Sequence, residues 1–206
     1  MLQENLINVQ AKIDAALARR TEEKITGNKV TLVAVTKNHP AEVITDAFNL
    51  GVPVIGENRV QEAKAKREIV GKGSGRWHLI GHLQTNKAKQ AVAIFDMIES
   101  ADSVHLMQAV DKEAAKAGKV QEILLQVNIA REEQKTGFSP EDYEAVVPEL
   151  DDFKNLHVRG LMVTAPAAEN SEDIRWVFAE GYKLYCKLKQ QRPDIDILSM
   201  LSLIHI

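Results

Sequence analysis

Lys37 is the residue whose sequence surroundings best suit chemistry. It ends a short apolar run, residues 30–36, and the turn-forming residues Asn38, His39 and Pro40 follow it at once. A strand would therefore deliver an amine to its carboxyl end, where parallel α/β folds bind ligands. Partial desolvation there lowers the pKa of an amine, and the neutral form can attack a carbonyl group to form a Schiff base. The alternative is a solvated lysine at a strand exit, because most lysines stay exposed.

Polar side chains also follow the next two apolar segments. Asn58 opens a predicted helix, where it could cap the first turn or turn toward a ligand. His78 and His82 are four residues apart across a change from strand to loop, so their spacing does not give the helical geometry of a metal site. No Cys/His cluster has zinc-like spacing, and no metal site is predicted.

Two later segments carry further candidates. Residues 135–138 read as a tight turn that returns Phe138 to the core. Gly160 permits a close approach of two backbones, and Met162 could either cover a flat ring or pack in the core.

Hydrophobic periodicity predicts the elements that position these residues. Strands are expected near residues 30–36, 52–55, 76–80, 94–98, 121–128, 157–162 and 195–199, and helices near 3–19, 41–50, 58–70, 85–91, 103–117, 140–149 and 171–191. Segments such as 30–35 and 123–127 are apolar on both faces, as in a parallel sheet covered by helices. The alternation leaves an open doubly wound sheet or a barrel. The glycines of residues 71–75 follow a helix rather than open one, which makes them a loop and favours the barrel.

Composition indicates one ordinary domain. The chain has 206 residues, of which 45% are hydrophobic and 27% charged. A net charge of −3, with both signs interspersed, argues against a nucleic-acid partner and favours small molecules. Cys186 is the one cysteine, so no internal disulfide can form. No leader-like start and no apolar run of about 20 residues is evident, so we expect a cytoplasmic protein without a membrane partner.

Six ordered segments together resemble the pyridoxal phosphate homeostasis protein family, whose members look like the barrel domain of alanine racemase standing alone. The segments are residues 34–37, 56–62, 77–87, 135–138, 159–162 and 198–200. The resemblance implies a TIM-type (β/α)8 barrel with an extra N-terminal helix. It also implies that Lys37 forms a Schiff base with pyridoxal 5'-phosphate, and that Asn58, His82, Met162 and Ser199 lie in or beside its pocket.

The resemblance stops near residue 200. In the family, the Ser-Met after the seventh strand continues into a glycine-containing loop, a helix, an eighth strand and an arginine-glycine turn that supply much of the phosphate site. Residues 201–206 do not match that pattern. We therefore expect one cofactor-binding barrel domain over 1–200, of about seven strands and without the C-terminal βα unit, and an apolar tail over 201–206. Such a chain would bind the cofactor weakly and tend to aggregate through unpaired strand edges.

Three functions fit these residues. The favoured one is a non-enzymatic protein of intracellular pyridoxal phosphate homeostasis, which holds the cofactor on Lys37 and helps to buffer it or to deliver it to partners such as apo-enzymes. The alternative is a racemase-like enzyme, which needs positioned bases. Related racemases take one base from a second domain of a partner subunit. We therefore do not expect racemase activity here. We also expect this chain to be a monomer. The third is a lysine-dependent aldolase acting on a sugar phosphate.

Overall fold

The computed structural model describes residues 2–20, 27, 29–71, 73, 75–132 and 134–202. In this part of the chain, one seven-stranded parallel sheet runs in the order β1 to β7. The strands are β1 Val33–Val35, β2 Val54–Glu57, β3 Arg76–Leu79, β4 Met97–Ala101, β5 Gln121–Val127, β6 Leu156–Thr164 and β7 Ile197–Leu201. Each strand pairs with the next along the chain, whereas a doubly wound sheet would reverse direction. The predicted barrel-type α/β fold is confirmed.

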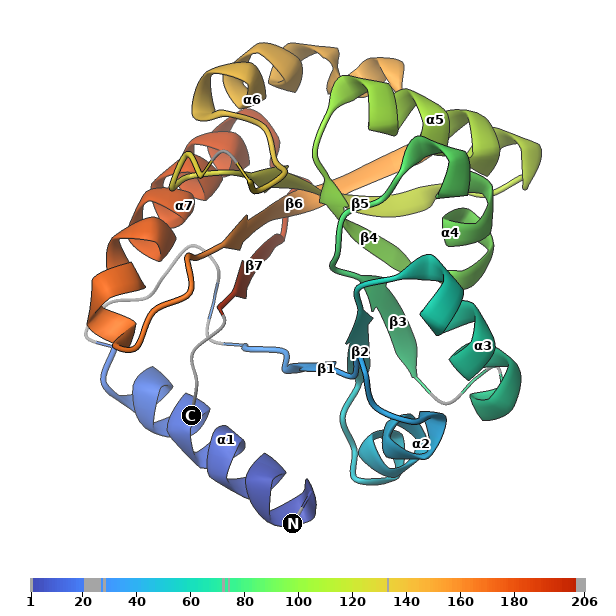
Figure 1. The fold of residues 1–206 in the computed structure, drawn as a ribbon. Coiled ribbons are helices and arrows are strands. Elements are labelled where there is room, and N and C mark those ends of the chain that lie inside the picture. Colours follow the sequence, from blue (N-terminus) through green and yellow to red (C-terminus); the bar gives the residue numbers. More distant parts are fainter. Residues whose placement is uncertain are drawn as a thin grey trace.

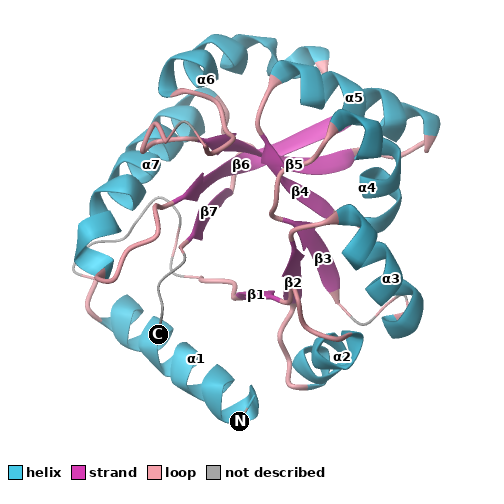
Figure 2. Ribbon diagram, in the orientation of Figure 1, coloured by secondary structure: helices cyan, strands magenta, loops and turns pink. Residues whose placement is uncertain are grey.

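Helices cover the outer face of the curled sheet (Figures 1 and 2). They are α2 Ala41–Asn49, α3 Val60–Val70, α4 Ala88–Ile94, α5 Val104–Lys116, α6 Pro140–Val146 and α7 Ser171–Gln191, with 3-10 turns at Thr85–Lys87 and Val147–Asp152. β1 and β7 stand at the two ends of the curve (Figure 1). The additional helix α1, Leu2–Ala18, precedes the sheet.

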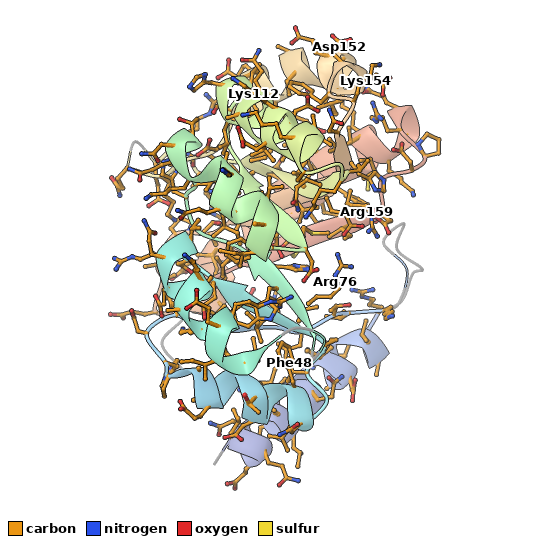
Figure 3. The ribbon with its side chains drawn as sticks, turned by 90° about the vertical axis from the view of Figure 1, so that its right-hand side faces the viewer. Phe48, Arg76, Lys112, Asp152, Lys154 and Arg159 are labelled. Atoms are coloured by element: carbon orange, nitrogen blue, oxygen red, sulfur yellow. The ribbon has the colours of Figure 1, made fainter. Side chains whose placement is uncertain are left out.

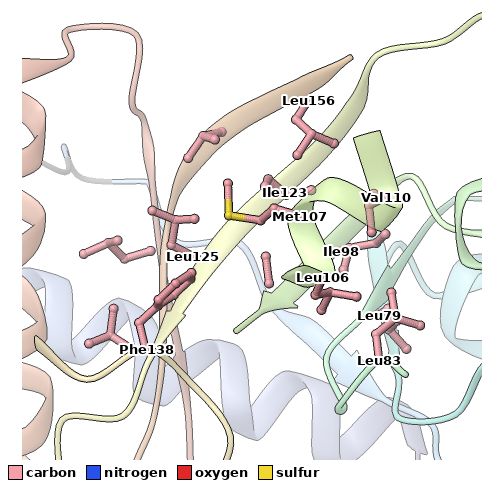
Figure 4. Close-up of a cluster of buried hydrophobic side chains, with 14 of the residues drawn as sticks. Leu79, Leu83, Ile98, Leu106, Met107, Val110, Ile123, Leu125, Phe138 and Leu156 are labelled. Carbon is pink, nitrogen blue, oxygen red and sulfur yellow. The ribbon is translucent and has the colours of Figure 1, made fainter. Parts of the chain in front are cut away.

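The main core lies between the sheet and these helices. Alternate strand residues such as Ile55, Trp77 and Ile98 face the helices and are fully buried. Leu106 and Met107 of α5 pack among them (Figure 4). Their burial fixes the register of each strand, because a slip of one residue would turn the apolar set to the other face.

The opposite pleat face points to the inside of the curve. Met97, Leu124 and Met162 form a separate buried cluster there, with Ile197 and Leu201 packed against it. Strand positions on the same face carry the polar groups described below, so the inner face is apolar at mid-height and polar at both strand ends.

Two expectations about the start of the chain need correction. The helix expected near residues 3–19 is present as α1, but none of its residues is buried, so α1 adds nothing to the core. The expectation that residues 30–35 are buried on both faces was wrong, since Val30 is 45% and Val35 is 37% exposed. The physical reason is that β1 pairs with β2 alone and has only three residues.

β6 and β7 approach each other closely at Gly160, as predicted. A Cβ atom at this position would lie 1.7 Å from the carbonyl oxygen of Ile197, so a side chain would force the two strands apart. β7 extends to Leu201, which pairs with Thr164. Leu201, expected to start the tail, thus belongs to the sheet, and residues 203–206 lie outside the described residues.

Candidate functional site

Lys37 lies directly beyond the carboxyl end of β1. Thr36 separates it from the strand, and the backbone turns through Asn38, whose φ of 62° is unusual for a non-glycine residue. The amide of His39 donates to the carbonyl oxygen of Thr36 at 3.1 Å and closes this turn. The side chain of Lys37 is partly exposed, so the amine is neither sealed in the core nor fully solvated.

Asn58 follows β2 at the same end of the sheet. Of the two alternatives for Asn58, capping of α3 is wrong, because Arg59 occupies the N-cap position and no side chain caps the helix. Its side-chain oxygen Oδ1 is buried and has no hydrogen-bond partner among the described residues. Gly81 packs against its backbone so closely that a Cβ there would lie 2.4 Å from the Asn58 carbonyl oxygen. Asn58 therefore has a closely packed backbone and a side-chain oxygen that could accept a hydrogen bond from a ligand.

A hydrogen-bonded chain crosses the inner face from β3 to β7. Nδ1 of His78 lies 2.6 Å from Oε1 of Glu99, and the hydroxyl of Ser199 donates to Oε2 of the same carboxylate at 2.6 Å. Glu99 is 3% and His78 7% exposed. Nε2 of His78 is buried without a partner in the described part of the chain. Glu99 thus orients both neighbours and leaves one imidazole nitrogen available.

Met162 lies beside Ser199. The two are register partners on β6 and β7, and Met162 is 1% exposed within the inner apolar cluster. On its other side it pairs with Gln126, whose amide nitrogen donates to the carbonyl oxygen of Thr136 at 3.0 Å. Met162 therefore forms an apolar floor next to polar groups.

The predicted turn over residues 135–138 is confirmed, since Phe138 is 5% exposed and packs onto the core.

His82 forms a second histidine–carboxylate pair. Its Nδ1 lies 2.8 Å from Oδ2 of Asp102. The Asp102 side chain is 9% exposed, whereas that of His82 is 52% exposed. A buried carboxylate on Nδ1 holds the ring in one orientation and leaves Nε2 directed to solvent or ligand, as in many general-base sites.

Of the five predicted site residues, Lys37, Asn58 and His82 follow the carboxyl ends of β1, β2 and β3, whereas Met162 lies within β6 and Ser199 within β7. The structure joins Met162 to Ser199 directly and places Asn58 against Gly81, the residue before His82. Sequence reasoning missed Glu99 and Asp102, although an acidic residue inside the apolar segment 97–101 was an available signal. In the described part of the chain no group of three His, Cys, Asp or Glu side chains could hold a metal ion.

The strands thus carry an amine, hydrogen-bonding side chains and an apolar side chain on or beyond their carboxyl halves. Such a set can take an aldehyde and hold a polar aromatic ring. No helix in the described residues is long and apolar enough to cross a membrane.

Comparisons with known proteins agree with this geometry. Residues 15–202 match the family model described as alanine racemase, N-terminal domain. A pyridoxal phosphate homeostasis protein of Aquifex aeolicus is 36% identical over 188 residues, which are 91% of this chain and 81% of that protein.

Solved structures show the same fold. PipY of Synechococcus elongatus with pyridoxal phosphate bound is 33% identical, with a TM-score of 0.74 over 93% of this chain and 96% of that one. An alanine racemase of Clostridium difficile has a TM-score of 0.72 over 94% of this chain and 49% of that one, and at 15% identity it supports the fold alone. The chain therefore belongs to the alanine racemase N-terminal domain family, among its pyridoxal phosphate homeostasis proteins.

Proposed function

We propose that this chain binds pyridoxal 5'-phosphate as a Schiff base on Lys37 and takes part in keeping the supply of this cofactor in balance. Asn58, His82, Met162 and Ser199 are proposed to lie in or beside the pocket. The relatives named above support the ligand, since one is named for pyridoxal phosphate homeostasis and another carries pyridoxal phosphate.

One observation carries the proposal from this chain's own residues. Buried polar atoms in folded proteins are normally hydrogen-bonded. Several buried side-chain atoms of the described residues break this rule, and two of them, Oδ1 of Asn58 and Nε2 of His78, lie at the end of the sheet that carries Lys37. A ligand with a polar ring and an aldehyde would satisfy these atoms while reacting with the amine.

The covalent step needs no further reactant. Nζ of Lys37 would hold the aldehyde carbon through a C=N bond in place of the C=O bond, and the aldehyde oxygen would leave as one water molecule. Neither partner is oxidised or reduced, and hydrolysis reverses the step. Reversibility suits a protein that stores and releases a reactive aldehyde.

The test is direct. The purified chain is mixed with pyridoxal phosphate, the absorption band of a protein-bound imine is recorded, and borohydride is added to fix the bond. Peptide mass spectrometry should place the fixed group on Lys37. K37A should lose the band, and K64M, which alters an exposed lysine of α3, should keep it. A fixed group on exposed lysines in the absence of one on Lys37 would refute the proposal.

A second candidate function rests on the His82–Asp102 pair. This arrangement is suited to a general base, which a racemase needs for removing the α-proton of an amino acid. Exchange of the α-proton of alanine in deuterated water separates the two functions. Exchange well above that of free pyridoxal phosphate, and lost in H82Q, would favour the enzyme. Exchange at the level of the free cofactor would favour the non-enzymatic role that the relatives' names indicate.

Hand-over to apo-enzymes, a cytoplasmic location and a monomeric state stay predictions. So does the division into a binding domain over 1–200 and a tail over 201–206. Analytical sedimentation with and without pyridoxal phosphate would test whether the chain is a monomer. Mixing the loaded chain with an apo-enzyme and measuring transfer of the cofactor would test the hand-over.

A further inference from the structure

A buried ion cluster lies beside the Lys37 turn. Lys66 of α3 is 6% exposed and Glu57, the last residue of β2, is fully buried. Nζ of Lys66 donates to Oε1 of Glu57, to Oε1 of Glu62 and to the carbonyl oxygen of Thr36, each at 2.7 Å. An ammonium group has three N–H donors, and here each has an acceptor.

The same cluster holds the peptide groups on both sides of Lys37. On one side, the carbonyl oxygen of Thr36 accepts from Lys66, and the Thr36 hydroxyl donates to Glu57 at 2.5 Å. On the other side, the amide of Asn38 donates to Oε1 of Glu62 at 2.7 Å. These groups belong to the two planar peptide units that flank the Cα atom of Lys37. Fixing both planes fixes φ and ψ of Lys37, and with them the direction of its Cα–Cβ bond.

We propose that Lys66 is a positioning residue that, through Glu57 and Glu62, aims the Lys37 side chain at the aldehyde. This inference rests on the proposed function, in which Lys37 reacts with pyridoxal phosphate. Lys66 and Lys37 have different roles in this proposal. Lys66 is buried and bound by two carboxylates and a backbone carbonyl, so it is not accessible to a ligand, whereas Lys37 is partly exposed and is accessible.

The charge distribution supports a positioning role. The hydrogen bond from Lys66 is the main cause that lowers the pKa of Glu62, so that carboxylate stays ionised and remains a strong acceptor for the Asn38 amide. Asn38 also needs such an anchor because its φ of 62° is a conformation that non-glycine residues adopt reluctantly. Without the cluster, the turn would relax and the amine would sample many directions.

The main test compares K66M/E57Q with wild type. The double variant removes both buried charges together, because K66M alone would leave the Glu57 carboxylate unpaired in the core. The expected result is at least a tenfold fall in the rate of imine formation with free pyridoxal phosphate, measured below the melting temperature. The fraction of borohydride-fixed adduct on Lys37 should fall as well. K64M, a matched change on the exposed side of α3, should react within twofold of wild type.

A second variant and a rescue separate positioning from stability. E62A removes the acceptor of the Asn38 amide at a side chain that is 23% exposed, so it should fold even if the double variant does not. K66R keeps a buried cation and should recover part of the rate. If folded K66M/E57Q and E62A both react within twofold of wild type, the inference is overturned.

Hydrogen exchange of the Asn38 amide gives a readout without the cofactor. It should quicken at least tenfold in E62A and in K66M/E57Q, and stay unchanged in K64M. Unchanged exchange would overturn the positioning role even if wild type forms an imine on Lys37. Faster exchange together with no imine on Lys37 in wild type would leave the anchored turn intact as a finding and refute the proposed function instead.

Discussion

Two polar clusters at opposite ends of the sheet differ in how completely their groups are paired. At the amino ends of the strands, Arg76, Glu122, Arg159 and Asp196 form a chain of ion pairs, here called the basal network. Arg76 and Arg159 lie near each other on the same edge of the sheet (Figure 3). At the carboxyl ends, Asn58, His78, Glu99 and Ser199, here called the mouth cluster, leave two buried polar atoms without partners.

This difference fits the proposed function, in which the carboxyl ends bind the ligand and the amino ends contribute stability. Every charge in the basal network faces an opposite one, and both oxygens of Glu122 are used. Paired groups have little left to offer a ligand. The mouth cluster instead keeps an unpaired oxygen and an unpaired ring nitrogen, at a cost to folding that a bound ligand can offset. Barrel folds generally place function at the carboxyl ends and stability at the amino ends.

The sharpest way to break this comparison is R159M. Arg159 bridges Glu122 and Asp196, and its side chain is 20% exposed. Loss of two charge-assisted contacts, discounted for solvent screening, should lower the free energy of unfolding by about 2 kcal/mol. The rate of imine formation with pyridoxal phosphate should stay within twofold of wild type. Urea denaturation measures the change in stability, and the absorption assay measures the rate of imine formation. A large loss of binding at unchanged stability would contradict the division of roles.

The converse change is N58L. Its side-chain oxygen is buried without a partner, so an apolar residue of similar volume removes an unfavourable group. We expect the free energy of unfolding to stay equal or rise by up to about 1 kcal/mol. Binding of pyridoxal phosphate should weaken about tenfold, which is about 1.4 kcal/mol. Equilibrium titration measures the affinity for pyridoxal phosphate, and urea denaturation measures the free energy of unfolding. A loss of stability as large as that of R159M would show that Asn58 is structural after all.

Acid should erase the advantage of the basal network. Burial alone would raise the pKa of Glu122, but hydrogen bonds from Arg76 and Arg159 outweigh burial and lower it. The hydrogen bond from Arg159 likewise lowers the pKa of Asp196. A carboxylate whose pKa is lowered on folding stabilises the protein above its unfolded pKa, near 4, and loses that contribution as the pH falls through the folded value.

The stability gap between wild type and R159M should therefore shrink by at least half between pH 7 and pH 3. Urea midpoints over this range measure it. N58L serves as the control, because the Asn58 amide does not titrate and its difference from wild type should stay level. A gap that is constant down to pH 3 would mean that these carboxylates do not act through Arg159.

Much of this fold could be read from the sequence because the buried strands are short apolar runs separated by helical periodicity. β3 and β5 and the long helix α7 follow that pattern closely. β1 was predicted as too long and too buried, since a strand with one neighbour looks locally like a strand with two. Leu201 shows the same limit, because an apolar tail and the end of an edge strand have the same local sequence pattern.

The site was predictable only in part. Lys37 stood out because it ends an apolar run, and Asn58, His82, Met162 and Ser199 came from the resemblance. The hydrogen-bonded pairs around the site could not be predicted from the sequence. Pairs such as His78 with Glu99 or Lys66 with Glu57 depend on which strand and helix faces meet in space. A lysine in the middle of an amphipathic helix usually signals a solvated face, and only the structure shows Lys66 turned inward.

The smallest expected effect is that of R175M. This variant tests whether an ion pair contributes to the free energy of unfolding wherever it lies in the fold. Arg175 pairs with Glu172 in the first turn of α7, and their side chains are 71% and 61% exposed. Solvent screening and the entropy of two long side chains leave such pairs with little net value. The urea midpoint and the rate of imine formation should both match wild type within error. A fall in stability close to that of R159M would mean that the basal network owes its effect to arginine pairs in general and not to their place beneath the inner core.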